Sequence, residues 1–221
     1  MQKPYALFDF DGTLISGDSL LLFLVYARKK GLCSAGNFWQ AVKAGLRYAL
    51  GLSTAQESKA AVMAFLKGHS REALLSFSVA FCEKKLRPRL RKQGLAELEA
   101  LRKKNVEILL ITASPAFYLD PLKDVLGVAA IIGTRVDFDQ AGNATGLICG
   151  ENCKGLQKPL RLAEYLAATG SELDYAGSSA YGDSASDMPM LALCQRKVGV
   201  NARRGLRREL QNAEGAELVH W

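Results

Sequence analysis

Histidine is almost missing from this chain: among 221 residues, only His69 and His220 occur. This scarcity excludes a catalytic centre built on clustered histidines and a zinc site with several histidine ligands. Cysteine is also sparse, and the five cysteines are odd in number and widely spaced, apart from Cys149 and Cys153. None has an arginine six positions later, so a Cys-x5-Arg phosphate loop is absent. The sequence therefore indicates no disulfide framework, and the predicted compartment is the reducing cytoplasm.

Long apolar runs are missing too. The longest candidate, residues 20–27, is followed by basic residues 28–30, and it is far shorter than the roughly 20 residues that a membrane-spanning helix needs. We interpret it as a buried helix, and the first residues lack the apolar stretch of a signal peptide. Positive charge is in excess, because 29 lysines and arginines against 22 acidic residues give a net charge of +7. This excess favours anionic partners without identifying one.

The order of predicted strands and helices indicates an α/β fold. Short apolar runs typical of buried strands alternate with helical stretches in the second half of the chain. The predicted strands cover residues 5–10, 106–111, 129–133, 178–182 and 197–201, and a hairpin joins 135–138 to 145–149. Helices are predicted at 156–168 and 205–212. We therefore expect a Rossmann-like parallel sheet with crossover helices.

Residues 15–100 depart from this alternation. They form long helical segments without a comparable strand signal, and Ser34, Ser53 and Ser70 are candidate N-caps. This block follows the first predicted strand directly. The predicted organisation is therefore an α/β hydrolase-like core of residues 1–14 and 101–221, with an inserted all-helical cap domain at residues 15–100.

Three predicted strands end in a polar residue, at Asp9, Thr112 and Asp183. Because ligands bind outside the carboxyl ends of parallel strands, we expect these side chains to converge. Asp9 and Asp11 alternate along an extended segment, so both face one pocket. Two close carboxylates resist simultaneous ionisation unless a cation or proton intervenes, which suits one as nucleophile and metal ligand and the other as proton shuttle. Gly12 permits the tight bend that follows.

A second acidic segment adds Asp183 and Asp187, four positions apart. Gathered carboxylates without histidine favour a hard cation, and Mg²⁺ held together with a substrate phosphate is the usual arrangement. A lysine near the helix 156–168 would supply positive charge. Lys158, at the start of that helix, and Lys154, just before it, both fit, and the residue types alone leave the choice open.

Taken in order, these segments resemble the four sequence motifs of the haloacid dehalogenase superfamily. The matching motifs are Asp-Phe-Asp-Gly-Thr at 9–13, a strand ending at Thr112, a lysine near 158 and Gly-Asp-Ser-Ala-Ser-Asp at 182–187. The helical insertion resembles the cap of the phosphoserine-phosphatase-like branch, and segments 112–115 and 152–155 resemble a subgroup in which some members dephosphorylate lipid phosphates. Dehalogenases of the superfamily lack an acid at the Asp11 position. The resemblance therefore implies a Mg²⁺-dependent phosphomonoester phosphatase with an aspartyl-phosphate intermediate.

The resemblance also implies a role for each residue. Asp9 attacks phosphorus, and Asp11 protonates the leaving oxygen and then activates water. Lys158 is preferred to Lys154, because the motif lysine usually opens the helix. The implied phosphate- and substrate-binding set is Gly12, Thr112, Ala113, Lys158 and Asp18. The implied metal set is Asp9, Asp11 through its backbone carbonyl, Asp183 and Asp187, the last either orienting Lys158 or binding through water.

Other functions on the same residues stay open. A phosphotransferase would share every catalytic residue and differ only in the acceptor. A phosphoserine phosphatase would use Asp18 for the substrate amine, but the matching cap segment 68–81 has no evident carboxylate-binding arginine, and Arg71 comes too early. A catalytically inactive binding protein is disfavoured because no motif residue is missing.

Large apolar residues of the cap and a basic cluster at 203–208 bear on the substrate. Phe23, Tyr26, Phe38, Trp39 and Tyr48 are expected either to pack as the cap core or to receive an apolar substrate. The basic cluster is read as a solvated helix face or as a weak contact with an anionic membrane. Nucleic acid is not expected, because no aromatic residues are interleaved with the basic ones. The predicted partner is a small phosphorylated substrate, with a lipid phosphate as the specific candidate.

Overall fold

A seven-stranded sheet forms the centre of this computed structural model, which describes residues 2–221. In spatial order the strands are β5 (Ala144–Cys149), β4 (Ala130–Phe138), β3 (Glu107–Pro115), β2 (Tyr5–Phe8), β7 (Ser179–Gly182), β8 (Arg196–Val200) and β9 (Ala216–Val219). Neighbouring strands are parallel, except that β4 and β5 form an antiparallel hairpin. β1 (Gln2–Lys3) and β6 (Glu172–Leu173) form a separate parallel pair. The predicted α/β fold with a parallel core sheet is confirmed.

The central strand β2 is buried on both faces. Tyr5 and Leu7 pack into one hydrophobic cluster, and Ala6 and Phe8 pack into the other, because successive side chains of a strand point to opposite faces. This double burial explains the unbroken apolar run in the sequence. The first polar residue, Asp9, consequently falls at the carboxyl edge of the sheet.

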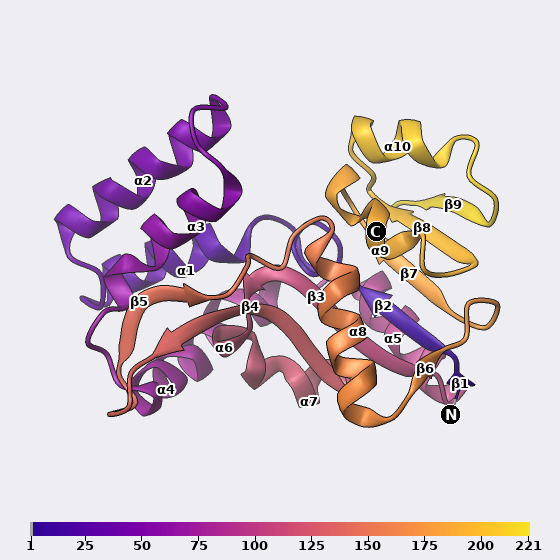
Figure 1. The fold of residues 1–221 in the computed structure, drawn as a ribbon, viewed down its shortest axis with the longest axis horizontal. Helices are drawn as coiled ribbons and strands as arrows, with labels where there is room; N and C mark the ends of the chain where they lie inside the picture. Colours follow the sequence, from indigo (N-terminus) through magenta and orange to yellow (C-terminus); the bar gives the residue numbers. More distant parts are fainter. Residues whose placement is uncertain (1) are drawn as a thin grey trace.

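Helices cover both faces of the sheet (Figure 1). The core helices are α5 (Lys92–Lys103), α6 (Ala116–Leu119), α7 (Lys123–Leu126), α8 (Gln157–Thr169), α9 (Met188–Leu191) and α10 (Arg204–Leu210), with 3-10 turns at Asp120–Leu122 and Ala185–Asp187. Leu98 of α5 belongs to the cluster of Phe8, whereas Leu162 of α8 and Leu206 of α10 belong to the cluster of Tyr5. α5 and α8 thus lie on opposite faces.

The inserted segment is helical. It comprises α1 (Ser19–Lys29), α2 (Ala35–Ala49), α3 (Ala55–Met63), a 3-10 turn at Ala64–Leu66, α4 (Arg71–Phe81), a π-helical turn at Cys82–Leu86 and a 3-10 turn at Arg87–Arg89. Phe23 and Tyr26 of α1 are buried, and Phe23 stacks on Tyr118 of the core with ring centroids 4.8 Å apart. Trp39 is 67% exposed and Tyr48 is 40% exposed. Cap-core packing therefore accounts for only part of the aromatic set.

The buried helix expected at residues 20–27 is confirmed as part of α1. Within residues 2–221, no helix is long and apolar enough to span a bilayer. The cap boundaries predicted at 14/15 and 100/101 stay predictions; α5, which includes the second, packs on β3.

Three local expectations differ from the structure. β4 is one continuous strand through Gly133, where two short strands were expected, and a side chain at Gly133 would overlap the backbone of Ser114. Thr54, not Ser53, caps α3, since its hydroxyl and the Glu57 carboxylate form a capping box. β9 was not expected, because an edge strand with half its residues exposed has no continuous apolar run.

Candidate active site

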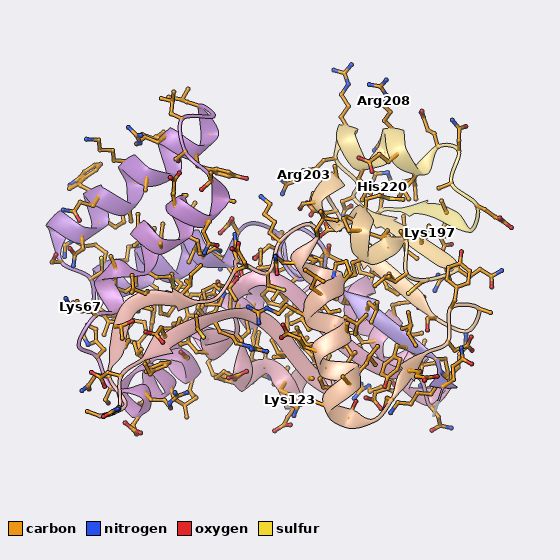
Figure 2. All side chains as sticks on the ribbon, viewed as in Figure 1. Lys67, Lys123, Lys197, Arg203, Arg208 and His220 are labelled. Carbon is orange, nitrogen blue, oxygen red and sulfur yellow. The ribbon has the colours of Figure 1, made fainter. Side chains whose placement is uncertain are left out.

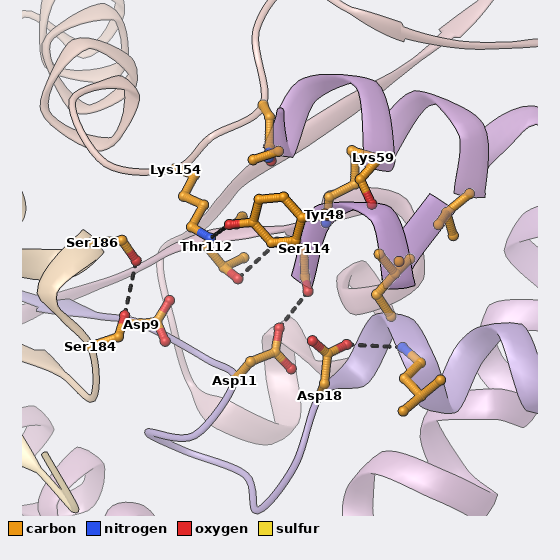
Figure 3. A pocket seen from close by; sticks show the side chains of 18 of the residues that line it. Asp9, Asp11, Asp18, Tyr48, Lys59, Thr112, Ser114, Lys154, Ser184 and Ser186 are labelled. Carbon is orange, nitrogen blue, oxygen red and sulfur yellow. Dashed lines mark hydrogen bonds between the residues drawn. The ribbon is translucent and has the colours of Figure 1, made fainter. Parts of the chain in front are cut away.

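A pocket of about 460 Å³ lies at the carboxyl edge of the sheet, between the core and helices α1, α2 and α3. Its core side is formed by residues that follow β2 and β7, by the carboxyl-terminal part of β3 and by the first turn of α8 (Figure 3). β3 runs on to Pro115, so Thr112, where the strand was expected to end, lies inside it. The structure brings the predicted site residues together here, although they are far apart in the sequence. Those that line the pocket are Asp9, Asp11, Asp18, Thr112, Ala113, Lys158, Asp183 and Asp187.

Lys158 lies at the centre of the charged residues. Its Nζ donates hydrogen bonds to Oδ1 of Asp9 and to Oδ1 of Asp187, each at 2.6 Å, and its side chain is 1% exposed. Burial alone would lower the pKa of Lys158, but the two carboxylates raise it above its usual value. The lysine is therefore a fixed positive charge next to the Asp9 carboxylate.

The three carboxylates Asp9, Asp183 and Asp187 form a compact cluster, each offering an oxygen within 4.8 Å of the others. Burial raises the pKa of Asp9 to about 8, although Lys158 opposes this shift. Burial also raises the pKa of Asp183, against the opposing charge of Arg203. Burial acts in the same sense on Asp187, but Lys158 and Ser184 donate to it and lower its pKa below the usual value. Confining these acids is costly unless a cation compensates their charge.

Asp187 also holds the loop after β7. Its Oδ2 accepts hydrogen bonds from the backbone N–H of Asp183 at 3.2 Å, and from the backbone N–H and the hydroxyl of Ser184 at 3.0 and 2.9 Å. With one oxygen on Lys158 and the other on this loop, Asp187 fixes the position of Asp183. Arg203, at the start of α10, donates to Oδ2 of Asp183 at 2.8 Å.

Gly12 does not line the pocket, but it packs directly behind Asp183. Its φ is +81°, a conformation that favours glycine, and an added Cβ would overlap the Asp183 carboxylate. The bend that the sequence predicted at Gly12 is present. Glycine is needed there both for the backbone and for the approach of Asp183.

Asp11 is held by hydroxyl donors on the cap side of Asp9. Its Oδ1 accepts from the backbone N–H of Ser19 at 2.6 Å, and its Oδ2 accepts from the hydroxyls of Ser19 and Ser114. The hydroxyl of Tyr118 lies 3.0 Å from that of Ser19. Burial raises the pKa of Asp11, and the nearby charge of Asp18 adds to the shift. A raised pKa suits a carboxyl group that carries a proton.

The remaining predicted residues occupy different parts of the pocket. The buried Thr112 hydroxyl accepts from the backbone N–H of Ser114 at 3.1 Å. Asp18 caps α1 by accepting from the N–H of Leu21 at 2.9 Å, at the cap side of the pocket. Of the two lysines that the residue types left open, Lys158 lies against Asp9, whereas Lys154 donates to the hydroxyl of Tyr48 at 2.7 Å and so joins the core to the cap.

Sequence reasoning missed Lys59 of α3. It lines the pocket from the cap side and is 9% exposed, and its side chain has no hydrogen bond or ion pair within residues 2–221 (Figure 3). Burial lowers its pKa, while the charges of Asp11 and Asp18 raise it. A single lysine in a polar helical stretch gives no sequence signal, because such a residue is usually solvated.

The donor set fits a hard divalent cation. Asp9, Asp183 and Asp187 supply only carboxylate oxygens, and both histidines of the chain lie outside the pocket lining. Such ligands suit Mg²⁺ far better than zinc. The structure thus has a group of acids able to hold a metal where the sequence predicted one.

Comparisons with known proteins agree with this geometry. A family model described as haloacid dehalogenase-like hydrolase matches residues 6–192. A histidinol-phosphatase of Neisseria meningitidis serogroup C is 30% identical over 215 residues, which cover 94% of each chain. The chain therefore belongs to the haloacid dehalogenase-like hydrolases, and its phosphatase relative supports the predicted class of phosphoric monoester hydrolase.

Two solved structures extend the comparison to the fold. A protein of unknown function from Bordetella pertussis Tohama I has a TM-score of 0.90 and 25% identity, covering 99% of each chain. A phospho-aspartyl intermediate analogue of phosphoserine phosphatase has a TM-score of 0.66 and 19% identity, covering 99% of this chain and 93% of the other. The predicted phosphoserine-phosphatase-like branch is confirmed at the level of the fold.

Proposed function

We propose that this haloacid dehalogenase-like hydrolase is a Mg²⁺-dependent phosphomonoester phosphatase that forms an aspartyl-phosphate on Asp9. The observation that carries the proposal is the position of Lys158, which donates to both Asp9 and Asp187 at 2.6 Å inside the pocket. A carboxylate beside a fixed cation is oriented for attack on phosphorus, and the same cation neutralises the incoming phosphoryl group. The related structure of a phospho-aspartyl analogue of phosphoserine phosphatase has the same fold.

The two steps use Asp9 and Asp11 in turn. In the first, an Asp9 oxygen forms a bond to phosphorus while the bond from phosphorus to the leaving oxygen breaks, and protonated Asp11 gives its proton to that oxygen. In the second, Asp11 takes a proton from water as the water oxygen attacks phosphorus, which releases phosphate and restores the Asp9 carboxylate. The raised pKa of Asp11 agrees with its role as proton donor in the first step.

Asp9, Asp183 and the backbone carbonyl of Asp11 would hold the Mg²⁺, which supplies compensation for phosphoryl charge when it is bound. Asp187 then acts on Lys158 and on the loop of Asp183, in line with its hydrogen bonds. The Thr112 hydroxyl and the segment around Ala113 would bind phosphate oxygens.

The cap side of the pocket supports a substrate class. Its apolar part comes from leucines and valines of α1, α2 and α3. The buried Lys59 is the cation on this side whose side chain has no partner among residues 2–221. The best match is a phosphomonoester whose leaving group has an apolar portion and a second anionic group. Lipid phosphates with a diester or carboxylate in the headgroup have both features.

The reaction class is tested with p-nitrophenyl phosphate. We expect phosphate release with Mg²⁺, loss of turnover with excess EDTA, and recovery when Mg²⁺ is restored. Asp9→Asn should lower kcat by about 1000-fold or more, as the loss of other covalent nucleophiles does, whereas Asp124→Asn on the exposed surface of α7 should leave it unchanged. An acid-quenched reaction should yield a phosphorylated peptide that contains Asp9. Full activity of Asp9→Asn, or full activity after exhaustive chelation, would contradict the proposal.

The substrate class is tested with a panel of phosphoserine, histidinol phosphate, short-chain lysophosphatidate and short-chain phosphatidylglycerophosphate. We expect phosphatidylglycerophosphate, which has both an apolar portion and a second anionic group, to have the highest kcat/KM, and lysophosphatidate, which has only the apolar portion, to come next. If a soluble compound exceeds every lipid by tenfold, the lipid assignment is wrong and the phosphatase assignment stands. Release of phosphate in the absence of an added alcohol separates a hydrolase from a phosphotransferase.

A further inference from the structure

Helix α2 presents a row of large apolar side chains to the outside of the cap. Trp39 is 67% exposed, Leu46 is 60% exposed and Leu50, at the end of the helix, is 73% exposed. At about 100° per residue these three positions fall within about 40° of one another, so they form one stripe along the helix. The only buried residue of α2 is Ala41. The amphipathic helix thus leaves an apolar stripe uncovered, which is unusual for a surface helix.

Basic side chains flank this stripe. Lys43 and Arg47 are exposed on α2, on the side that follows the stripe around the helix. Arg28, Lys29 and Lys30 are exposed at the end of α1, shortly before α2 begins. An exposed tryptophan and leucines beside lysine and arginine are the composition of helices that lie in the interface of an anionic bilayer.

The stripe is continuous with the pocket. Leu46 belongs to the stripe and also lines the pocket, and Val42, one turn before it, lines the pocket as well. In Figure 1, α2 and α10 project on the same side of the molecule, with the carboxyl edge of the sheet between them. Figure 2 shows Arg208 on the side of α10 that faces away from the sheet. A flat surface resting on α2 would therefore face basic residues of α10 across the pocket opening.

We propose that the exposed stripe of α2, Trp39, Leu46 and Leu50 with Lys43 and Arg47, docks on an anionic lipid bilayer and brings lipid-borne phosphates to the pocket. The charge argues for a lipid surface over a second copy of the chain. Two copies, each with a net charge of +7, would repel each other, and the basic residues beside the two stripes would add to the repulsion. The delivery of lipid phosphates to the pocket rests on the proposed phosphatase function, whereas the docking itself needs no catalysis.

The test is binding to vesicles, with and without phosphatidylglycerol in phosphatidylcholine, followed by flotation. We expect binding that requires phosphatidylglycerol and weakens with salt as screening grows. The double variant Trp39→Ser/Leu50→Ser should bind at least tenfold more weakly. The matched control is Leu75→Ser/Val79→Ser, which removes two exposed apolar side chains, at 50% and 48% exposure, from α4. It should bind like the wild type.

A second readout reports on Trp39 directly. In a Trp221→Phe background, which leaves Trp39 as the only tryptophan, its emission should shift to the blue on anionic vesicles and stay unchanged on phosphatidylcholine alone. The two stripe positions of the double variant lie outside the pocket lining, so its turnover of p-nitrophenyl phosphate should match the wild type.

Each outcome bears on one proposal at a time. Absent vesicle binding with normal hydrolysis would overturn the docking and leave the phosphatase function standing. Vesicle binding without hydrolysis of any phosphomonoester would overturn the phosphatase function and leave the docking standing. A dimer in solution that the stripe variant dissolves, with no vesicle binding, would make the stripe a protein interface and overturn the docking.

Discussion

Substituting Lys59 by methionine separates the cost of burying a charge from the benefit that this charge gives to substrate binding. Lys59 is 9% exposed where it lines the pocket, and its side chain has no hydrogen-bond partner within the described chain, so its ammonium group is partly desolvated without full compensation. Methionine has a similar length and volume and no charge. We therefore expect Lys59→Met to be more stable than the wild type and poorer at catalysis.

The magnitude follows from the surroundings of Lys59. An unsatisfied buried polar group costs about 1–3 kcal/mol, and the charges of Asp11 and Asp18 offset part of this cost. A net gain of about 1–2 kcal/mol remains after a methionine of matching volume is packed in. For a chain of this size, such a gain raises Tm by about 2–8 °C.

The pH dependence has a definite sign. Because burial lowers the pKa of Lys59 below 10.5, the unfolded chain holds this proton at pH values where the folded chain has lost it. The cost of the buried charge is therefore full at neutral pH and disappears as the pH rises through the folded pKa toward 10.5. The stability advantage of Lys59→Met should shrink over the same range.

Urea unfolding at pH 7 and pH 10 measures the stability, and kcat/KM for two substrates measures the function. We expect about a tenfold or greater loss with a substrate that has a second anionic group, the loss of one charge-assisted hydrogen bond, and little loss with p-nitrophenyl phosphate. Lys59→Arg, which keeps the charge, is the matched control and should retain the preference. A destabilised Lys59→Met protein, or an equal loss with both substrates, would refute the reasoning.

Further predictions concern the carboxylate cluster. Gly12→Ala should lose more than about 100-fold in kcat/KM, because the added Cβ would displace Asp183. A loss of this size is expected when a group that aligns the reacting atoms is displaced. Near-normal activity would contradict this contact. Asp183→Asn should raise the Mg²⁺ concentration for half-maximal activity with little change in urea midpoint. Asp187→Ala should instead lower the free energy of unfolding by about 3 kcal/mol or more, because it leaves Lys158 and the loop partly unpaired in the interior. An Asp187→Ala protein as stable as Asp183→Asn would argue against the positioning role.

The parts of the fold that could be predicted are those in which the pattern of apolar residues along the chain matches the burial of their side chains. β2 reads as an apolar run because its side chains are buried on both faces, and the polar residue that ends it must lie at the sheet edge. β9 could not be predicted, because pairing with β8, rather than any apolar pattern of its own, makes Ala216–Val219 a strand.

The site also has residues that could be predicted from the sequence and residues that could not. Asp9, Asp11 and Asp183 follow strands whose ends must meet, so their convergence could be derived from topology. Lys59 comes from a cap helix whose orientation depends on the packing of α1, α2 and α3, and nothing in its neighbours along the chain indicates burial. The residues that select a substrate are therefore harder to find by sequence than the residues that react with phosphate.

The β4–β5 hairpin restricts how the cap can move. Backbone hydrogen bonds join Gly68 and His69 of the cap to Ala144, and Arg71 to Gly142. Residues 68–71 therefore attach the cap to the core at a third point, in addition to its two chain connections. A rigid swing of the whole cap would break all of these bonds at once. Helices α2 and α3 are held differently. Their hydrogen bonds to the core are single side-chain bonds, from Lys154 to Tyr48 and between Gln56 and the loop before α8, and α3 also packs on β5. Isolated side-chain bonds open far more easily than a set of backbone bonds. Substrate exchange is therefore expected to proceed by a hinge within the cap, in which α2 and α3 move while residues 68–71 stay attached to the sheet.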